Sequence, residues 1–294
     1  MDLLTSLTPL EGGWSGETFL AEAGGERSVV RIFADPRHAP EAAEIQAALL
    51  RLVRGLVPVP EVLEVRRADP VAGTPPLLVT EHVAGVRGDL LLPTLDGPSL
   101  TRVGEALGRI AGTLAGMPQL VGGTFADREL RVAPYDLDLT DWVASHADGL
   151  AWSEDDLLAL RDVAAAAQTR LDTVGRVSLV HSDLNPKNVL LDPDTLAVSA
   201  VLDWEFSHAG SPFSDLGNLV RFDRRQEYVA GVLRGWVTLR GGADDEALEL
   251  ARCADLVALV ELAARKDANP VAARAHDHLL AIARRGDVHA LPSD

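Results

Sequence analysis

The chain has 294 residues and a hydrophobic content of 47%, enough to fill two lobes with ordinary cores. Its formal net charge of -17 disfavours nucleic acid and anionic membranes as partners and is compatible with a cationic substrate. No segment approaches about eighteen apolar residues without a charge, and Met1-Asp2-Leu3 lacks a basic start. Neither a membrane span nor a signal peptide is therefore predicted, and the expected location is the cytoplasm.

The first third of the chain has the pattern of β-strands around one helix. Glycine pairs and prolines separate short apolar runs, and one longer run has helical spacing. The predicted elements are a Gly-rich loop entering a strand over 10–19, a hairpin turn at Gly24-Gly25, a strand over 28–33, a helix over 40–54, and strands over 62–65 and 76–80.

Three glycines stand in the first loop, two of them Gly13 and Gly16. Glycine lets backbone amides approach a phosphate group without side-chain obstruction, so this loop is a candidate nucleotide lid. Ser15 would either donate to a phosphate oxygen or cap the turn. A plain hairpin explains a Gly-rich turn equally well, and it is the position of the loop relative to the rest of the chain that favours phosphate binding.

Most of the remaining chain is predicted to be helical, which is typical of an α-rich C-terminal lobe. The only cysteine, Cys253, lies in a helical apolar pattern and is expected to be buried and inert, which excludes an intrachain disulfide and a cysteine-based metal cage. Apolar residues at three-and-four spacing predict helices over 104–115, 155–171, 226–239 and 246–265.

A phosphotransferase active site is indicated by the stretch from His181 to Asn188, followed fifteen residues later by Asp203. Phosphoryl transfer needs a carboxylate that accepts the proton of the attacking hydroxyl, and oxygen ligands that hold Mg²⁺ against the nucleotide phosphates. Asp183 has the side chain for the first role. Asn188 and Asp203 would supply an amide oxygen and a carboxylate to the metal.

The flanking apolar runs support this arrangement. Strands are predicted over 177–180, entering the loop, over 189–191, leaving it, and over 197–202, returning to Asp203 after the turn at Asp192-Pro193-Asp194. The three side chains can therefore converge. The alternative is that an Asp and an Asn at a strand end merely satisfy turn amides.

These loops resemble those of the aminoglycoside phosphotransferase family, small-molecule kinases with a protein-kinase-like fold. The family motif reads His-Gly-Asp with Asn five residues after the Asp, and then Asp-Trp-Glu; here Ser182 replaces the glycine and Asp203-Trp204-Glu205 matches the second part. The resemblance implies that Asp215 braces the catalytic loop. It also implies an α+β, two-lobed protein-kinase-like fold, with a small β-rich N-terminal nucleotide-binding lobe over 1–82, a larger, mainly α-helical C-terminal lobe over 83–294, and a hinge at about 81–88.

The same resemblance implies how the nucleotide is held. Backbone groups of Glu81 and Val83 at the hinge would contact the purine, and Arg31 stands where the family has a strand lysine that touches the phosphates. Arginine keeps the charge and binds phosphate bidentately, but it is not an ammonium point charge. The helix partner of Arg31 is either Glu44, as an ion pair, or Gln46, as a weaker hydrogen bond.

Two features separate the chain from protein kinases. Ser/Thr kinases place a lysine two residues after the catalytic Asp, where this chain has Asn185. Only eleven residues lie between Asp203 and Asp215, too few for an activation loop that supports a peptide substrate. The acceptor is therefore expected to be a small molecule.

The predicted function is that of an antibiotic-modifying kinase: an O-phosphotransferase that uses ATP or GTP with Mg²⁺ and phosphorylates a cationic acceptor such as an aminoglycoside or another antibiotic. A choline-like or sugar-like metabolite remains an alternative acceptor. Part of the acidic pattern is explained equally well without an acceptor, since solvated acids are favoured at the N-terminus of a helix. Weak candidates for acceptor binding are Asp136, Asp138, Asp141 and Glu205, with Asp255 and Glu261 further along.

Two other classes of function stay open. Arg31 and Gln46 depart from the family pattern, so a catalytically silent nucleotide-binding module is one of them. The other is a metal-dependent hydrolase with His181, Asp183 and Asp203 as ligands, which needs a further His or carboxylate such as Glu205 or His208. No feature of the sequence indicates an oligomeric state.

Overall fold

The computed structural model describes residues 6–10, 18–35, 38–69 and 71–292. The chain divides into two compact units, each assembled from separate segments. Unit 1 comprises Met1–Ser99, Gly123–Ala133 and Asp183–His208, and unit 2 comprises Leu100–Gly122, Pro134–Ser182 and Ala209–Asp294. The predicted division into residues 1–82 and 83–294 stays a prediction.

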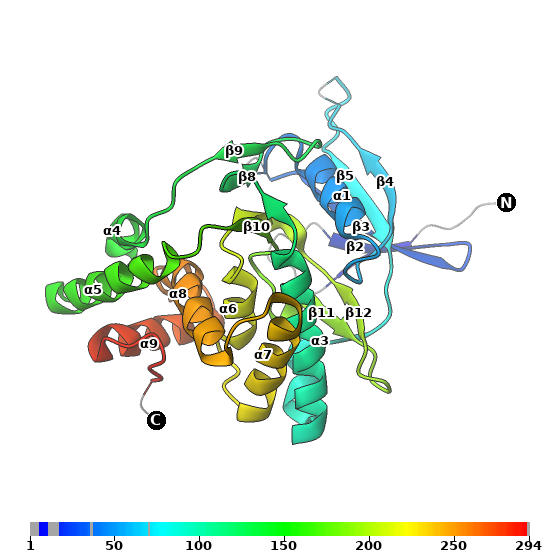
Figure 1. Ribbon diagram of the computed structural model, residues 1–294. Helices are drawn as coiled ribbons and strands as arrows, with labels where there is room; N and C mark the ends of the chain where they lie inside the picture. The colour runs from blue at the N-terminus through cyan, green and yellow to red at the C-terminus, as the bar shows by residue number, and fades with distance from the viewer. Residues whose placement is uncertain (1–5, 11–17, 36–37, 70, 293–294) are drawn as a thin grey trace. The chain divides into compact units, whose positions relative to one another are not determined.

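An antiparallel sheet with the strand order β1-β2-β3-β5-β4 forms the β-rich part of unit 1 (Figure 1). The turn between β2 and β3 is at Gly24-Gly25, where φ is 61° and 88°, a conformation that glycine adopts without strain. The predicted hairpin is therefore confirmed. The strands are β1 (Ser6–Pro9), β2 (Thr18–Ala23), β3 (Glu26–Ile32), β4 (Val62–Arg66) and β5 (Leu77–Glu81).

Helix α1 (Ala42–Val53) packs against β4 and β5 of this sheet. Ala43, Ala47 and Leu50 recur at helical spacing on its buried face, and Arg51 and Leu52 are its exposed residues. The helix predicted over 40–54 is confirmed; it begins slightly later and ends slightly earlier than predicted.

A small three-stranded sheet in unit 1, ordered β12-β11-β6, carries the segments that the sequence assigns to chemistry. β11 (Val189–Leu191) pairs antiparallel with β12 (Val198–Val201) and with β6 (Val86–Arg87). The backbone of Gly88 lies against this region so closely that a Cβ would come within 2.7 Å of the Pro186 carbonyl oxygen, so only glycine fits. Unit 1 also contains α2 (Gly88–Leu91), η1 (Leu92–Thr94), β8 (Gly123–Phe125), β9 (Val132–Pro134), η2 (Pro186–Asn188) and η3 (Trp204–Phe206).

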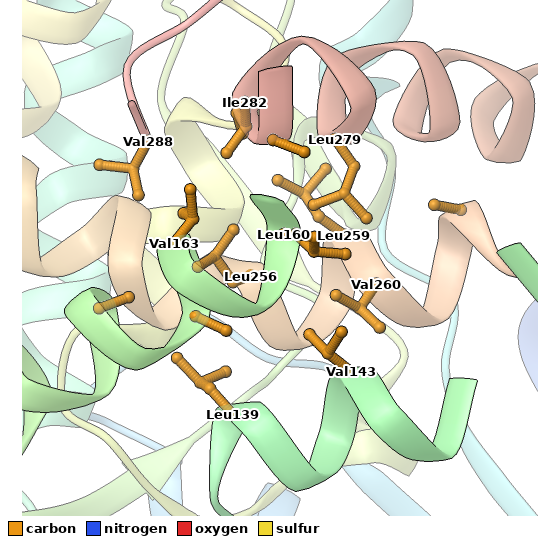
Figure 2. Packing of buried hydrophobic residues seen from close by; sticks show 14 of the residues in the cluster. Leu139, Val143, Leu160, Val163, Leu256, Leu259, Val260, Leu279, Ile282 and Val288 are labelled. Atoms are coloured by element: carbon orange, nitrogen blue, oxygen red, sulfur yellow. The ribbon is translucent and has the colours of Figure 1, made fainter. Parts of the chain in front are cut away.

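Unit 2 is mainly helical, and its core lies where α4, α5, α8 and α9 meet (Figure 2). Cys253 is 1% exposed within this cluster, and burial raises the pKa of its thiol to about 11, as expected of an inert cysteine. The elements are α3 (Gly97–Ala115), α4 (Leu139–Leu150), α5 (Glu154–Leu171), α6 (Ser214–Val220), α7 (Gln226–Arg240), α8 (Asp244–Ala263) and α9 (Pro270–Arg285), with the short strands β7 (Pro118–Gln119), β10 (Val177–Val180) and β13 (His208–Gly210).

Helices α3 and α7 approach each other at the level of their backbones. A Cβ on Gly108 of α3 would lie 2.0 Å from the Val232 carbonyl oxygen, and one on Gly235 of α7 would lie 2.2 Å from the Glu105 carbonyl oxygen. The glycines where α3 and α7 meet therefore set the distance between the two helices. No helix in the described ranges is long and apolar enough to cross a membrane.

An ion pair ties α6 to α8 inside unit 2. Arg221 donates to both oxygens of Asp255, at 2.6 Å from Nη2 to Oδ1, and Asn218 Nδ2 adds a bond of 3.1 Å. Asp255 is only 4% exposed. This carboxylate, an acid that the sequence placed in the acceptor cleft, is thus a buried partner of an arginine.

We expect His278 of α9 to make the protein acid-sensitive. Burial, with Arg224 beside the ring, lowers the pKa of His278 to about 4, whereas the pKa in the unfolded chain is about 6.5. The neutral ring is favoured in the fold, so its stabilising contribution is present above about pH 6.5 and is lost as the pH falls toward 4, by on the order of 3 kcal/mol. Urea unfolding at pH 7 and pH 4 should show this loss in the wild type and not in His278→Gln. His276→Gln on the same helix should keep it, and an equal acid loss in His278→Gln would contradict the assignment.

Candidate active site

The loop after β10 is anchored by a buried carboxylate of unit 2. Asp215, at the start of α6 and 1% exposed, accepts hydrogen bonds from the backbone N–H groups of His181 at 2.9 Å and Ser182 at 2.8 Å. This is the bracing expected of Asp215. Ser182 has φ 69°, in the left-handed region, which costs a residue with a Cβ roughly 1–2 kcal/mol. The exchange of the family's glycine for serine at this position therefore carries a backbone cost.

Asp183 and Asn188 are joined directly in unit 1. Asn188 ends η2 and is 4% exposed, and its Nδ2 donates to Asp183 Oδ2 at 2.7 Å and to the Asp183 carbonyl at 2.9 Å. Because the amide nitrogen is committed to Asp183, the amide oxygen is the atom of Asn188 suited to a cation.

Asp203 follows β12 and is brought to the same place by the backbone. The N–H of Leu202 donates to the Asn188 carbonyl at 2.8 Å, so the residue before Asp203 is hydrogen-bonded to the loop. Asp203 has φ 65°, a left-handed turn, and the next side chain, Trp204, is buried and donates from Nε1 to the Val201 carbonyl at 3.1 Å. Trp204 thereby fixes the turn that presents Asp203.

This donor set fits Mg²⁺. One carboxylate and one amide oxygen are hard ligands, and a magnesium ion that binds a nucleotide completes its shell with phosphate oxygens and water. No group of three or more His, Cys, Asp or Glu side chains that could hold a metal ion is found among the described residues.

Arg31 of β3 pairs with the two acids of the second loop. Its Nη1 donates to Asp203 Oδ1 at 2.8 Å and its Nη2 to Glu205, while Gln46 of α1 lies at 3.5 Å from Nη1, a long and weak hydrogen bond. The guanidinium also lies over the Phe33 ring, 5.3 Å from its centroid. The sequence left the helix partner open between Glu44 and Gln46, and the contact is with Gln46.

Glu44 is engaged elsewhere. Its carboxylate accepts from Arg67 at 2.7 Å and lies 3.8 Å from Arg128. The stronger partners of Arg31 are the acids of the second loop, which sequence reasoning did not assign to it.

Glu205, the second acid that contacts Arg31, has a raised pKa. Burial raises the pKa of its carboxyl, the negative charge of Asp203 raises it further, and Arg31 opposes both effects. The Arg31 guanidinium thus favours the ionised form of Glu205.

We expect Arg31 to contribute to nucleotide binding by charge-assisted hydrogen bonds. Arg31→Ala should lose roughly 1.5–3 kcal/mol, seen as weaker nucleotide binding or slower transfer, and Arg31→Lys should retain much of the function because it keeps the charge. Calorimetry with ATP and a turnover assay would measure both variants. Equal behaviour of all three proteins would reduce Arg31 to a structural ion-pair partner.

The structure describes only some of the other residues predicted to contact the nucleotide. Gly13, Ser15 and Gly16 lie outside the described residues. Glu81 ends β5, and its N–H donates to the Glu61 carbonyl at 2.9 Å, so this amide is committed to the sheet. Val83 follows the strand and is partly exposed. Their contacts to a purine stay a prediction.

The acids proposed for acceptor binding lie in different units. Glu205 is in unit 1, and Asp136, Asp138 and Asp141 are in unit 2. Asp138 caps α4: its Oδ1 accepts from the N–H groups of Thr140 at 2.7 Å and Asp141 at 3.2 Å. The hydrogen bond from the Thr140 hydroxyl, followed by these two backbone bonds, holds the pKa of Asp138 below its usual range. Asp136 and Asp141 are exposed. Glu261 forms a surface pair with Arg265 at 2.9 Å.

Asn185, to which no role in the site is assigned from the sequence, also contacts Asp183. Its Nδ2 donates to Asp183 Oδ1 at 2.7 Å. No local pattern indicates this bond, since the usual partner of an Asn or Asp side chain in a turn is a backbone group.

The chain spans 52% and 20% of the lengths of two curated relatives that it matches; the 20% refers to acyl-CoA dehydrogenase family member 10 of Mus musculus, and the 52% to the relative described first below. The first is an aminoglycoside 3'-phosphotransferase of Streptomyces fradiae, 35% identical over 156 residues, or 50% of this chain. Among solved structures, a microcompartment-associated aminopropanol kinase has a TM-score of 0.70 at 22% identity, covering 96% of this chain and 92% of that one. A thermostable mutant of an aminoglycoside phosphotransferase, in a ternary complex with ADP and hygromycin B, has a TM-score of 0.65 at 18% identity, covering 96% and 94%.

These structures confirm the predicted fold class: a β-rich N-terminal lobe with a helical C-terminal region, as in the aminoglycoside phosphotransferases. The sequence model of the phosphotransferase enzyme family matches residues 6–251, most of the chain. The two loops predict a phosphotransferase, and the matched family is a family of phosphotransferases. The chain therefore belongs to the phosphotransferase enzyme family.

Proposed function

We propose that the protein is a small-molecule O-phosphotransferase that moves the γ-phosphoryl group of ATP or GTP to a hydroxyl of a cationic acceptor. The observation that carries the proposal is the hydrogen-bonded group of Asp183 and Asn188, with the segment before Asp203 bonded to the Asn188 carbonyl. A carboxylate and two hard metal ligands are the parts that phosphoryl transfer requires. Membership of the phosphotransferase enzyme family supports the assignment.

In this proposal each residue has one task. Asp183 orients the acceptor hydroxyl and takes its proton as the oxygen attacks. Asn188 and Asp203 would hold Mg²⁺, which would supply charge neutralisation at the nucleotide phosphates. Arg31 contacts the phosphates from β3, and backbone groups near Glu81 and Val83 bind the purine; Gly13, Ser15 and Gly16, outside the described residues, stay candidate phosphate contacts.

A cationic acceptor is favoured by two observations. The net charge is -17, and acidic clefts raise the local concentration of cations and orient them. The relatives named above are an aminoglycoside phosphotransferase and an aminopropanol kinase, and both names denote amine-bearing acceptors. We therefore propose an amino-sugar antibiotic or a small amino-alcohol, with Asp136, Asp138, Asp141 and Glu205 as candidate contacts.

The test is a panel of aminoglycosides, macrolides and amino-alcohols incubated with the protein, Mg²⁺ and ATP or GTP. A product heavier by one phosphoryl group, detected by mass spectrometry, is the expected result. The affinity for that acceptor should weaken as salt rises, since exposed charge attraction is screened over about 10 Å at 0.1 M.

The outcomes of this panel separate the alternatives. A neutral acceptor with salt-independent affinity would remove the electrostatic argument and leave the kinase assignment standing. No product and no nucleotide hydrolysis, together with a thermal shift on adding Mg-ATP, would replace the proposal by a silent nucleotide-binding module.

A further inference from the structure

We propose that Asn185 is a positioning residue for Asp183: it fixes the direction of the catalytic carboxylate and ties it to the metal ligand Asn188. The inference rests on the proposed function, because it assigns Asp183 to the acceptor hydroxyl. It adds a residue whose role would be exerted through Asp183 rather than on substrate or nucleotide.

Both oxygens of Asp183 receive an amide N–H. Asn185 Nδ2 donates to Oδ1 at 2.7 Å and Asn188 Nδ2 donates to Oδ2 at 2.7 Å. A carboxylate held at both oxygens keeps one orientation about its terminal torsion, which is otherwise broad. The plane of the Asp183 carboxylate is therefore set by two asparagines.

The two asparagines are the two ends of one element. Asn185 is the N-cap of η2, where its Oδ1 accepts from the Lys187 N–H at 3.0 Å, and Asn188 is the last residue of that helix. The Asn188 N–H returns to the Asn185 carbonyl at 2.9 Å. A shift of Asn185 would thus move the base and the metal ligand together.

Only an amide satisfies position 185. Its oxygen must accept from the helix N–H while its nitrogen donates to a carboxylate, and asparagine has both groups on a side chain short enough for an N-cap. Aspartate would keep the cap, lose the donor and set a second negative charge against Asp183. The change Asn185→Asp therefore removes the positioning contact while leaving the helix cap in place.

The first experiment compares Asn185→Asp with the wild type on the acceptor that the panel identifies. We expect kcat to fall about 100-fold, the effect of a misplaced reacting group, while KM for the acceptor and the Kd of Mg-nucleotide stay within about twofold. The matched control is Asn269→Asp. Asn269 caps α9 by accepting from the Ala272 N–H at 2.9 Å, so the same substitution is made at a cap in unit 2, and kcat should be unchanged.

The second experiment exchanges the two partners. In the double variant Asp183→Asn with Asn185→Asp, the new asparagine donates to the new aspartate and still accepts from Asn188, so the contact is remade with its polarity reversed. Asn185→Asp alone should lower Tm by about 2–4 °C, and the double variant should recover that loss while remaining inactive.

The results distinguish the failure of this inference from the failure of the proposed function. An unchanged kcat in Asn185→Asp, or Tm losses of the two single changes that simply add in the double variant, would overturn the positioning role. A wild type that phosphorylates nothing would overturn the function, and the exchange would still decide whether Asn185 holds Asp183.

Discussion

Replacing Asp183 by asparagine is expected to slow phosphoryl transfer by about 10²–10⁴-fold, because the variant has no group that accepts the hydroxyl proton. Nucleotide affinity should stay near that of the wild type, since Asp183 faces the acceptor in the proposed site and the metal is held by Asn188 and Asp203. The measurement pairs a turnover assay on the identified acceptor with calorimetry of Mg-ATP binding.

The contacts of Asp183 add a second expectation for this variant. Both oxygens accept from amides in the wild type, and asparagine has only one oxygen, so its own NH₂ group must face the amide of Asn185 or Asn188. A modest loss of stability should accompany the loss of rate. Asp194→Asn, the same change in the exposed turn after β11, is the control and should alter neither. An Asp183→Asn protein that turns over like the wild type would exclude this residue from proton transfer.

The strands around the loops could be predicted because their signals are local. The apolar runs at 177–180 and 189–191 are bounded by turn residues, and β10 and β11 have those bounds. Helix α3 begins at Gly97, earlier than the predicted 104, since its first turns carry glycine, proline and polar residues rather than an apolar stripe. No helix is predicted over 139–150, where the structure has α4, although Asp138 before an apolar run is an N-cap signal.

The roles of Asp183, Asn188 and Asp203 could be proposed from residue type and spacing, but the partners of Arg31 could not. Asp203 and Glu205 lie 172 and 174 residues further along the chain, and helical geometry around α1 offered only Glu44 and Gln46. Glu44 instead pairs with Arg67, which belongs to the segment after β4. Long-range pairing of this kind is decided by tertiary packing, which no local pattern encodes.

Backbone strain was equally hidden. Ser182 and Asp203 both have left-handed φ values, 69° and 65°, and serine does not signal that conformation as glycine would. Such strain persists where surrounding contacts fix the backbone, here the loop N–H groups that donate to Asp215 and the burial of Trp204.

Replacing Asp203 by alanine should abolish the dependence of nucleotide binding on Mg²⁺. Asp203 is the one carboxylate in the proposed metal set, and the amide oxygen of Asn188 is a weaker ligand without it. The substitution also frees Nη1 of Arg31 from its 2.8 Å contact, while Nη2 keeps Glu205. Metal-free ATP should therefore bind the variant at least as well as it binds the wild type, because a guanidinium with one less carboxylate attracts phosphate more strongly.

Calorimetry with ATP, in the presence of Mg²⁺ or of a chelator, measures both expectations on the same protein. The wild type should gain affinity when Mg²⁺ is added, and Asp203→Ala should not. Glu64→Ala is the matched control: Glu64 is also paired with an arginine in unit 1, at 2.7 Å from Arg66, but on exposed β4, so its loss should leave the response to Mg²⁺ intact. An Asp203→Ala protein that still binds ATP more tightly with Mg²⁺ would place the metal on other ligands, and the assignment of Asn188 would fall with it.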